Sequence, residues 1–172
     1  MAMKDIWQAA NPKGHLLTAI SFLIPVVCGA GFVISIGMSM GGTVQDSLIA
    51  GQFDLWQAMA TMGAKALGLL PVVIAIGIAG SIAGKPGVAP GLVVGLAANA
   101  ISAGFIGGMI GGYMAGYLCL GIIKYVKVPK WARGLMPTLI VPFLGSLISG
   151  LVMVYIIGTP VGAFTDALTG FL

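Results

Sequence analysis

The sequence contains no glutamate, since all four of its acidic residues are aspartates, and charged residues make up only 7% of the chain. A soluble domain carries roughly 25% charged residues, so this composition excludes an ordinary soluble protein. The 172 residues also lack a Walker loop, a dinucleotide-binding glycine fingerprint, a zinc-ligand spacing and a serine-hydrolase elbow. We therefore expect no catalytic residue, no metal and no cofactor in this chain.

Cysteine is scarce as well. The two cysteines, Cys28 and Cys119, have neither CxxC spacing nor a histidine nearby, and each lies in an apolar stretch. A disulfide or a metal site is therefore not expected. We interpret both residues as buried, small apolar side chains within helices.

Long apolar runs are abundant: 59% of the residues are hydrophobic and the mean hydropathy is +1.10. The runs cover residues 16–40, 66–84, 91–123 and 135–158. About 20 residues of helix cross a hydrocarbon layer of roughly 30 Å, so these runs are long enough for membrane spans. The alternating pattern of barrel strands is absent. The predicted fold is all-α, a polytopic transmembrane helical bundle.

The basic residues predict how the spans are oriented. Four of the eight lie in residues 124–134, beside a membrane segment, which is typical of a cytoplasmic loop rather than a nucleic-acid surface. If Lys85 also faces the cytoplasm, residues 91–123 must cross the membrane an even number of times. We predict two short or tilted helices at about 90–104 and 106–123, with a re-entrant hairpin as the alternative. The total is about five spans, with a cytoplasmic N-terminus.

Amphipathic segments accompany the spans. Residues 1–14 are predicted to form an interfacial helix on the cytoplasmic side. Residues 41–64 place two aspartates among apolar residues at helical spacing, which predicts a loop followed by an interfacial amphipathic helix. Residues 159–172 follow a glycine and include a proline, so we expect a loop that leads into another element.

The most regular motif is GFIGGMIGGYMAG, in which Gly104, Gly108, Gly112 and Gly116 recur every four residues. On a helix this spacing makes a groove without side chains, into which another helix backbone can press closely. We interpret these glycines as sites of helix packing or of dimerisation. A smooth surface along a permeation path is the alternative.

The stretch AGSIAGKPGVAPG interrupts two apolar runs with one lysine and two prolines. A lysine deep in the bilayer costs about 2.5–3.5 kcal/mol, so Lys85 marks where a span leaves the membrane. Pro86 and Pro90 are expected to stop the helices on either side, with glycines allowing tight turns. The stretch is then a short loop with a topology charge. Alternatively, Lys85, Pro86 and Gly87 contact an anionic partner or a sugar phosphate through the ammonium and free backbone N–H groups.

Two further polar residues are candidates for ligand contact. Asn99 is the strongly hydrogen-bonding amide of the 91–123 segment, and an interhelical hydrogen bond is its simpler interpretation. His15 lies just before the first span. We expect it to be an interfacial, solvated histidine, with a proton or sugar role as the alternative.

Four blocks of the sequence together resemble one family. They are HLLTAISFLIPVVCGAGFVISIG, AGSIAGKPGVAPGLVVG, GFIGGMIGGYMAGYLCLGIIK and VPKWARGLMPTLIVPFLGSLISGLVMVYIIGTPV. In this order and spacing they resemble IIC, the membrane component of bacterial fructose-family phosphotransferase systems, from about His15 to the C-terminus. One departure is Lys85, where the family loop commonly has arginine, so a bidentate contact is lost while the charge is kept.

The resemblance implies a permease of the bacterial cytoplasmic membrane that presents a fructose-like sugar to IIB. IIB phosphorylates the sugar within a phosphoenolpyruvate-dependent relay that also includes IIA. This chain would carry no phosphorylation site. Similar IIC proteins are about twice as long, and their second half holds an Ile-Thr-Glu-Gly-Ala type motif whose glutamate binds sugar. That motif is absent here.

The resemblance also implies a domain assignment. Residues 1–172 would form a single membrane domain, the N-terminal scaffold and homodimerisation half, with 159–172 starting a missing C-terminal half. The chain is then a fragment or one part of a split transporter, and its partners include the second half, IIB, sugar and membrane lipid. Two alternatives remain open: a self-sufficient small oligomeric channel and a truncated membrane protein that does not transport.

Overall fold

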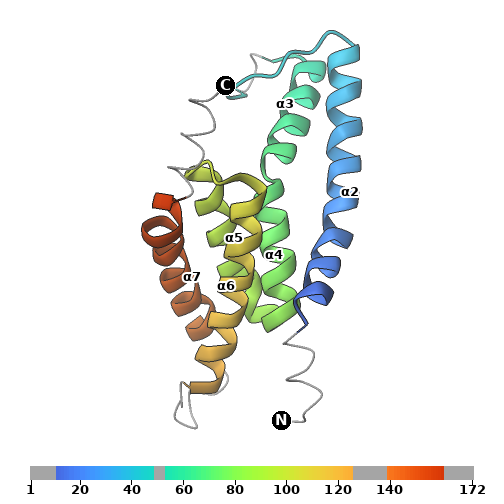
Figure 1. Ribbon diagram of the computed structural model, residues 1–172. Coiled ribbons are helices and arrows are strands. Elements are labelled where there is room, and N and C mark those ends of the chain that lie inside the picture. The colour runs from blue at the N-terminus through green and yellow to red at the C-terminus, as the bar shows by residue number, and fades with distance from the viewer. Residues whose placement is uncertain (1–10, 49–52, 126–138, 161–172) are drawn as a thin grey trace. The chain divides into compact units, whose positions relative to one another are not determined.

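The computed structural model describes residues 11–48, 53–125 and 139–160, and its regular elements there are all helical. This confirms the all-α prediction. The elements are α2 (Pro12–Ser39), α3 (Leu55–Gly68), α4 (Leu70–Ala83), α5 (Lys85–Ala100), α6 (Gly104–Tyr125), α7 (Val141–Val152) and the π-helix η3 (Met153–Ile157) (Figure 1). The predicted interfacial helix at 1–14 lies outside the described residues except for its last turn, where α2 begins. The segment 159–172 and the basic cluster 124–134 also lie almost entirely outside them.

The chain divides into two compact units. One unit takes in Met1–Ser21 and Pro71–Leu172, and the other is Phe22–Leu70. The first contains the start of α2 and the helices α4 to α7, whereas the second contains the rest of α2 and α3. Each unit is described below by itself.

In the unit that contains α4 to α7, short connections fold the chain back on itself. One residue, Gly84, links α4 to α5, and residues 101–103 link α5 to α6. Connections this short leave successive helices antiparallel and adjacent, as Figure 1 shows. Helix α5 contacts both α6 and α7, and α6 also contacts α7. The core between them consists of small or apolar side chains: Ala79, Val94, Ala98, Ala103, Ala115 and Met153.

Glycines on α5 allow it to lie almost directly on the backbone of α4. A β-carbon at Gly91 would be 2.9 Å from the carbonyl oxygen of Ala75, and one at Gly95 would be 2.5 Å from Cα of Val72. Gly87 is also buried, against Ala79. Such contacts replace water-driven burial as the source of helix association in lipid. Glycines beside the two prolines were expected to allow tight turns, and this is wrong for Gly87 and Gly91, which lie inside α5.

The unit Phe22–Leu70 uses the same kind of packing. A β-carbon at Gly63 of α3 would lie 2.6 Å from the backbone nitrogen of Ile34 on α2. Asp54 caps α3: its carboxylate accepts a 2.8 Å hydrogen bond from the N–H of Leu55, while the Gln57 side chain accepts from the N–H of Asp54. A reciprocal capping box of this kind fixes where a helix begins. The loop and helix predicted within 41–64 are therefore confirmed, and the helix's place at the membrane interface stays a prediction.

Three helices in the described residues are long and apolar enough to cross a membrane: α2, α6 and the continuous helix Val141–Pro160. A fourth span exists if α3 and α4 count together as one broken helix. The second predicted span, 66–84, differs from the structure because the helix breaks at Leu69. Helix α5 has 16 residues and is shorter than the about 20 that a bilayer requires. By length and composition, the described residues therefore contain three or four spans, compared with the about five that were predicted.

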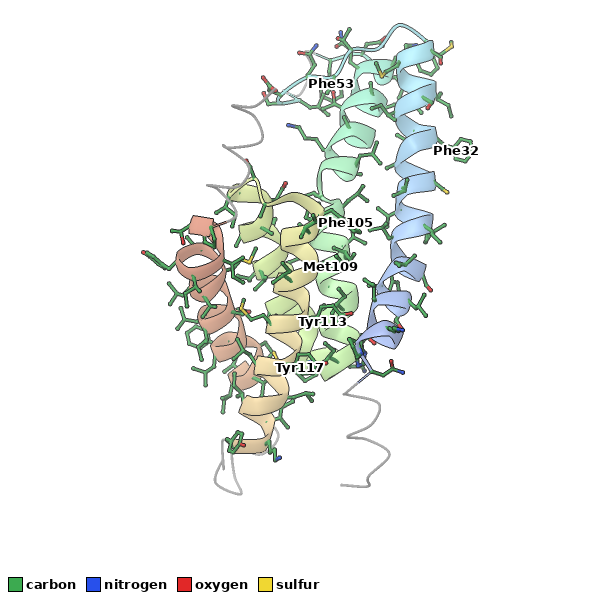
Figure 2. The ribbon with its side chains drawn as sticks, viewed as in Figure 1. Phe32, Phe53, Phe105, Met109, Tyr113 and Tyr117 are labelled. Carbon is green, nitrogen blue, oxygen red and sulfur yellow. The ribbon has the colours of Figure 1, made fainter. Side chains whose placement is uncertain are left out.

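The two cysteines differ in their surroundings. Cys119 on α6 is buried, as predicted, and lies close to Gly145 of α7. Cys28 is exposed on α2, so its predicted burial is wrong. The physical reason is that α2 turns much of its apolar surface outward, with Phe22, Ile24, Phe32 and Ile36 all exposed. Figure 2 shows Phe32 pointing away from the ribbon.

Candidate functional site

All the charged side chains among the described residues of the larger unit are lysines at one end of it. Lys13 lies in the first turn of α2, Lys85 opens α5 and Lys124 is in the last turn of α6. These helix termini lie at the same end of the bundle because the helices alternate in direction (Figure 1). No aspartate occurs in residues 11–21, 71–125 or 139–160. This end, called the cationic end below, therefore favours anionic groups.

Lys85 borders an open groove at this end. The groove has a volume of about 900 Å³ and is formed by the α4–α5 corner, one face of α5 and the start of α7. Its lining residues are Ala83, Gly84, Lys85, Pro86, Val88, Ala89, Leu92 and Pro142. One ammonium group thus borders a surface that is otherwise apolar.

The corner between α4 and α5 is sharper than the sequence suggested. Gly84 has φ +69° and ψ −149°, and α5 begins at Lys85. Pro86 is accommodated because the first N–H groups of a helix have no partner to lose. Pro90 does not stop the helix as predicted but lies within α5, packed closely against Gly145 of α7.

The backbone of this corner has fewer free N–H donors for an anion than predicted. The N–H of Gly87 donates a 3.0 Å hydrogen bond to the carbonyl of Gly84, and a proline has no N–H to give. Gly87 is also buried against α4. Of the three predicted contact residues in this stretch, Lys85 is therefore the one that presents a donor to the surface.

His15 is buried rather than solvated, which corrects its expected state. It is 7% exposed, and its Nδ1 lies 2.7 Å from Oγ of Ser81 on α4. Its Nε2 is buried and has no hydrogen-bond partner among the described residues. The first turns of α2 lie this close to α4 because a glycine faces them: a β-carbon at Gly77 would be 2.8 Å from Cα of Ala19. The structure thus brings His15 within one helical turn of the Lys85 corner.

A tyrosine that the sequence analysis missed ties α2 to α6. The hydroxyl of Tyr113 donates a 2.5 Å hydrogen bond to the backbone carbonyl of Pro12. Tyr113 also stacks on Tyr117, with ring centroids 6.4 Å apart. Figure 2 shows Phe105, Met109, Tyr113 and Tyr117 following one another along α6. Their spacing of four residues was visible in the sequence, but nothing there indicated what the hydroxyl of Tyr113 would bond.

Asn99 lies far from Lys85, at the opposite end of α5. It is exposed on the last turn of α5, and 14 residues of helix, about 21 Å, separate it from Lys85. Its backbone carbonyl accepts a hydrogen bond from the N–H of Ser102. No interhelical hydrogen bond of its side chain occurs among the described residues, so that interpretation stays a prediction.

The glycine motif on α6 faces the chain's own α4. A β-carbon at Gly112 would lie 2.9 Å from Cα of Ala75, and one at Gly116 would lie 2.9 Å from Cβ of Ile82. Gly108 is equally close to Pro71. Gly104 differs, since it has φ +58° and no neighbour within 4 Å. The groove on α6 is filled within one chain, and a role for these glycines in dimerisation stays a prediction.

The pairing of His15 with Ser81 leads to a first expected result. Ser81→Ala removes the hydrogen-bond partner of a buried histidine nitrogen, which should lower the free energy of unfolding by about 1–3 kcal/mol. His15→Leu in that background removes the need for the bond, so the two substitutions together should cost less than the sum of each alone. Thermal unfolding of the four proteins in one detergent measures the difference. Strictly additive effects would contradict a hydrogen bond between these side chains.

Relatives of this chain are components of one transport system. It is 44% identical over 170 residues, 95% of its length, to the "PTS system fructose-specific EIIB'BC component" of Rhodobacter capsulatus. It is 41% identical over 172 residues, with 96% of the chain matched, to the protein of the same name from Escherichia coli K12. The match to "Fructose-like permease IIC component 2" of Escherichia coli K12 is 32% over 168 residues, or 94% of the chain.

The chain spans only part of these relatives. It covers 28% of the Rhodobacter protein, 29% of the first Escherichia coli protein and 45% of the second. No protein-family model matches the chain. No solved structure matches it either. The likeness therefore rests on longer relatives that align with nearly the whole length of this chain.

Proposed function

Because the chain is homologous to the IIC membrane components of the bacterial fructose-family phosphotransferase system, we propose that it is part of a sugar permease of that system. The sugar would be fructose or a fructose-like compound. Its phosphorylation would be done by a IIB domain or protein, itself supplied with phosphate through IIA. The sequence match over 94–96% of the chain is the observation that carries this proposal.

We propose that the chain supplies the scaffold of this permease rather than its sugar-binding part. The close glycine-mediated packing of α5 and α6 on α4 supports a rigid support structure. The absence of glutamate supports it too, because the glutamate that the family resemblance implies for sugar binding would then come from another part of the permease. In such an arrangement a second part moves the sugar past this one.

We also propose an orientation in the bacterial cytoplasmic membrane. The lysines of the cationic end lie at one end of the larger unit, and cytoplasmic ends of membrane proteins carry an excess of Lys and Arg. The cationic end, with the N-terminal start of α2, would therefore face the cytoplasm. IIB would approach from this side, near Lys85. A homodimer would form through outward surfaces, since α4 already occupies the glycine groove of α6.

Uptake of labelled fructose tests this function. Bacteria without their own fructose permease would receive this chain, a IIB protein and the remaining part of a fructose-type IIC as a separate polypeptide. We expect labelled fructose phosphate to accumulate only when all three are present, because the proposed scaffold alone does not bind sugar. Omitting each component in turn provides the matched controls, and co-purification verifies that the parts assemble.

Liposomes that contain this chain alone distinguish the permease from a channel. Fructose flux in these liposomes, without any second polypeptide, would overturn the scaffold proposal. So would a lack of uptake in cells whose three components are shown to assemble.

A further inference from the structure

One face of α5 combines a charge at its end with an unpartnered apolar surface. Lys85 is followed at helical spacing by Val88, Leu92 and Leu96, whose side chains are 44%, 43% and 46% exposed. Positions separated by three or four residues lie on the same side of a helix. The first two apolar residues line the groove of about 900 Å³ that begins at Lys85 and is closed on one side by Pro142 of α7.

The ammonium group of Lys85 has no opposite charge among the described residues of its own unit. The described residues of that unit include no aspartate, and glutamate is absent from the whole chain. The nearest turn of backbone adds to the positive potential, because the N-terminus of a helix such as α5 carries a partial positive charge. Within the part of this unit that the structure describes, Lys85 therefore presents an uncompensated cation where α5 begins.

We propose that this groove binds one anionic phospholipid, with the lipid phosphate at Lys85 and an acyl chain along Val88, Leu92 and Leu96. The distance along α5 from residue 88 to residue 96 is about 12 Å, which suits a stretch of extended acyl chain. The apolar lining supplies contacts to the hydrocarbon, and the lysine selects the sign of the headgroup. This site is additional to the proposed transport function, and because IIB is proposed to approach near Lys85, its test includes competition by IIB.

The chemistry of the groove favours a lipid over a soluble anion. A free phosphate is usually held by several converging donors, whereas here a single ammonium lies beside a proline-containing turn whose Gly87 N–H is already bonded to Gly84. A soluble acidic protein would gain little from a groove with an apolar floor that continues along α5. A phospholipid matches both features, since it has a charged end and a long apolar end.

Native mass spectrometry of the full chain in detergent tests the site. The probes are phosphatidylglycerol and phosphatidylcholine with identical acyl chains. We expect one retained phosphatidylglycerol, bound about fivefold more tightly than phosphatidylcholine, as one lysine near the surface provides. Lys85→Ala should abolish that preference, and Lys85→Arg should keep it. Lys124→Ala is the matched control, because it removes one charge at the same end of the bundle without touching the groove.

The apolar part of the site has its own variants. Leu92→Gln should weaken retention of both lipids, whereas Leu147→Gln, at an exposed position of α7 outside the groove, should leave it unchanged. Both positions are on the surface, so neither substitution should prevent folding.

Equal effects of Lys85→Ala and Lys124→Ala would overturn the proposal, because they indicate diffuse attraction to the cationic end. Displacement of phosphatidylglycerol by water-soluble glycerol phosphate would overturn it in favour of a free-anion site. Binding of purified IIB protein that displaces phosphatidylglycerol one for one would assign the groove to that partner instead.

Discussion

Gly112→Leu is expected to prevent α6 from packing on α4 and to destabilise the larger unit by more than about 3 kcal/mol. A β-carbon at this position would lie 2.9 Å from Cα and 3.0 Å from the carbonyl oxygen of Ala75. These are backbone atoms of a neighbouring helix, which cannot rotate away as a side chain can. The two helices must separate, and the dispersion contacts along their whole length weaken.

The matched control is Gly121→Leu, the same substitution on the same helix. A β-carbon at Gly121 has no neighbour within 4 Å, and leucine is a better helix former than glycine. This variant should unfold at or above the temperature of the unsubstituted chain, while Gly112→Leu should unfold well below it or fail to accumulate. Thermal unfolding in detergent, followed by circular dichroism, measures both. Equal stability of the two variants would show that α6 does not rest on α4 at this position.

The result would also separate packing within the chain from dimerisation. If the α6 glycines formed the contact between two chains, Gly112→Leu would yield a stable monomer. Because α4 fills the groove, we expect loss of the fold and not a change of oligomer mass alone. Sedimentation of the detergent-solubilised variant distinguishes these outcomes.

The extent of the helices could be predicted because the physical constraint is local and strong. Long apolar runs without charge must be helical in a membrane, since each backbone group needs an internal partner. The first apolar run at 16–40 and the helix predicted at about 106–123 follow from this, and α2 and α6 match them. The helix predicted at about 90–104 is also present as α5, but it begins five residues earlier, at Lys85. The break at Leu69 was missed although Gly68 and Pro71 flank it, because the apolar run 66–84 was interpreted as a single span and a proline is tolerated within a membrane helix.

The packing partners could be predicted only in part. A spacing of four glycines on α6 predicts a close helix contact, but not whether the partner is α4 or another chain. The equivalent stripe on α5, at positions 87, 91 and 95, was hidden by two prolines that suggested a turn. Proline early in a helix and glycine inside it are only weak signals for a helix break. Here α5 continues through them, and its glycines pack closely on α4.

The candidate site shows the same limit. Lys85 was placed correctly at a helix boundary because a charge in lipid is costly. His15 was misjudged because its partner Ser81 is 66 residues away along the chain. Its burial depends on how closely α2 approaches α4. No local pattern near His15 contains that information.

Gly84→Val is expected to displace Lys85 from the groove and to lower the free energy of unfolding by up to about 3 kcal/mol. Gly84 adopts φ +69° and ψ −149°, a backbone region that is essentially restricted to glycine. A β-carbon there would meet no neighbour within 4 Å, so the cost arises from the backbone itself. To relieve it, the chain must give up the single-residue corner that joins α4 to α5 in antiparallel packing.

Gly29→Val is the control for a valine introduced on a helix in open space, because Gly29 also has no neighbour within 4 Å but lies inside α2. Valine and glycine differ little in a helix interior compared with this corner, so its melting temperature should stay near that of the unsubstituted chain. Gly84→Val should melt clearly lower and should also lose the lysine-dependent preference for phosphatidylglycerol. The two losses belong together, because the strained glycine sets the direction in which α5 begins and hence where its first side chain, Lys85, meets the groove. Unchanged melting of Gly84→Val would mean that the corner tolerates a side chain and that the α4–α5 connection is not the tight turn that positions this charge.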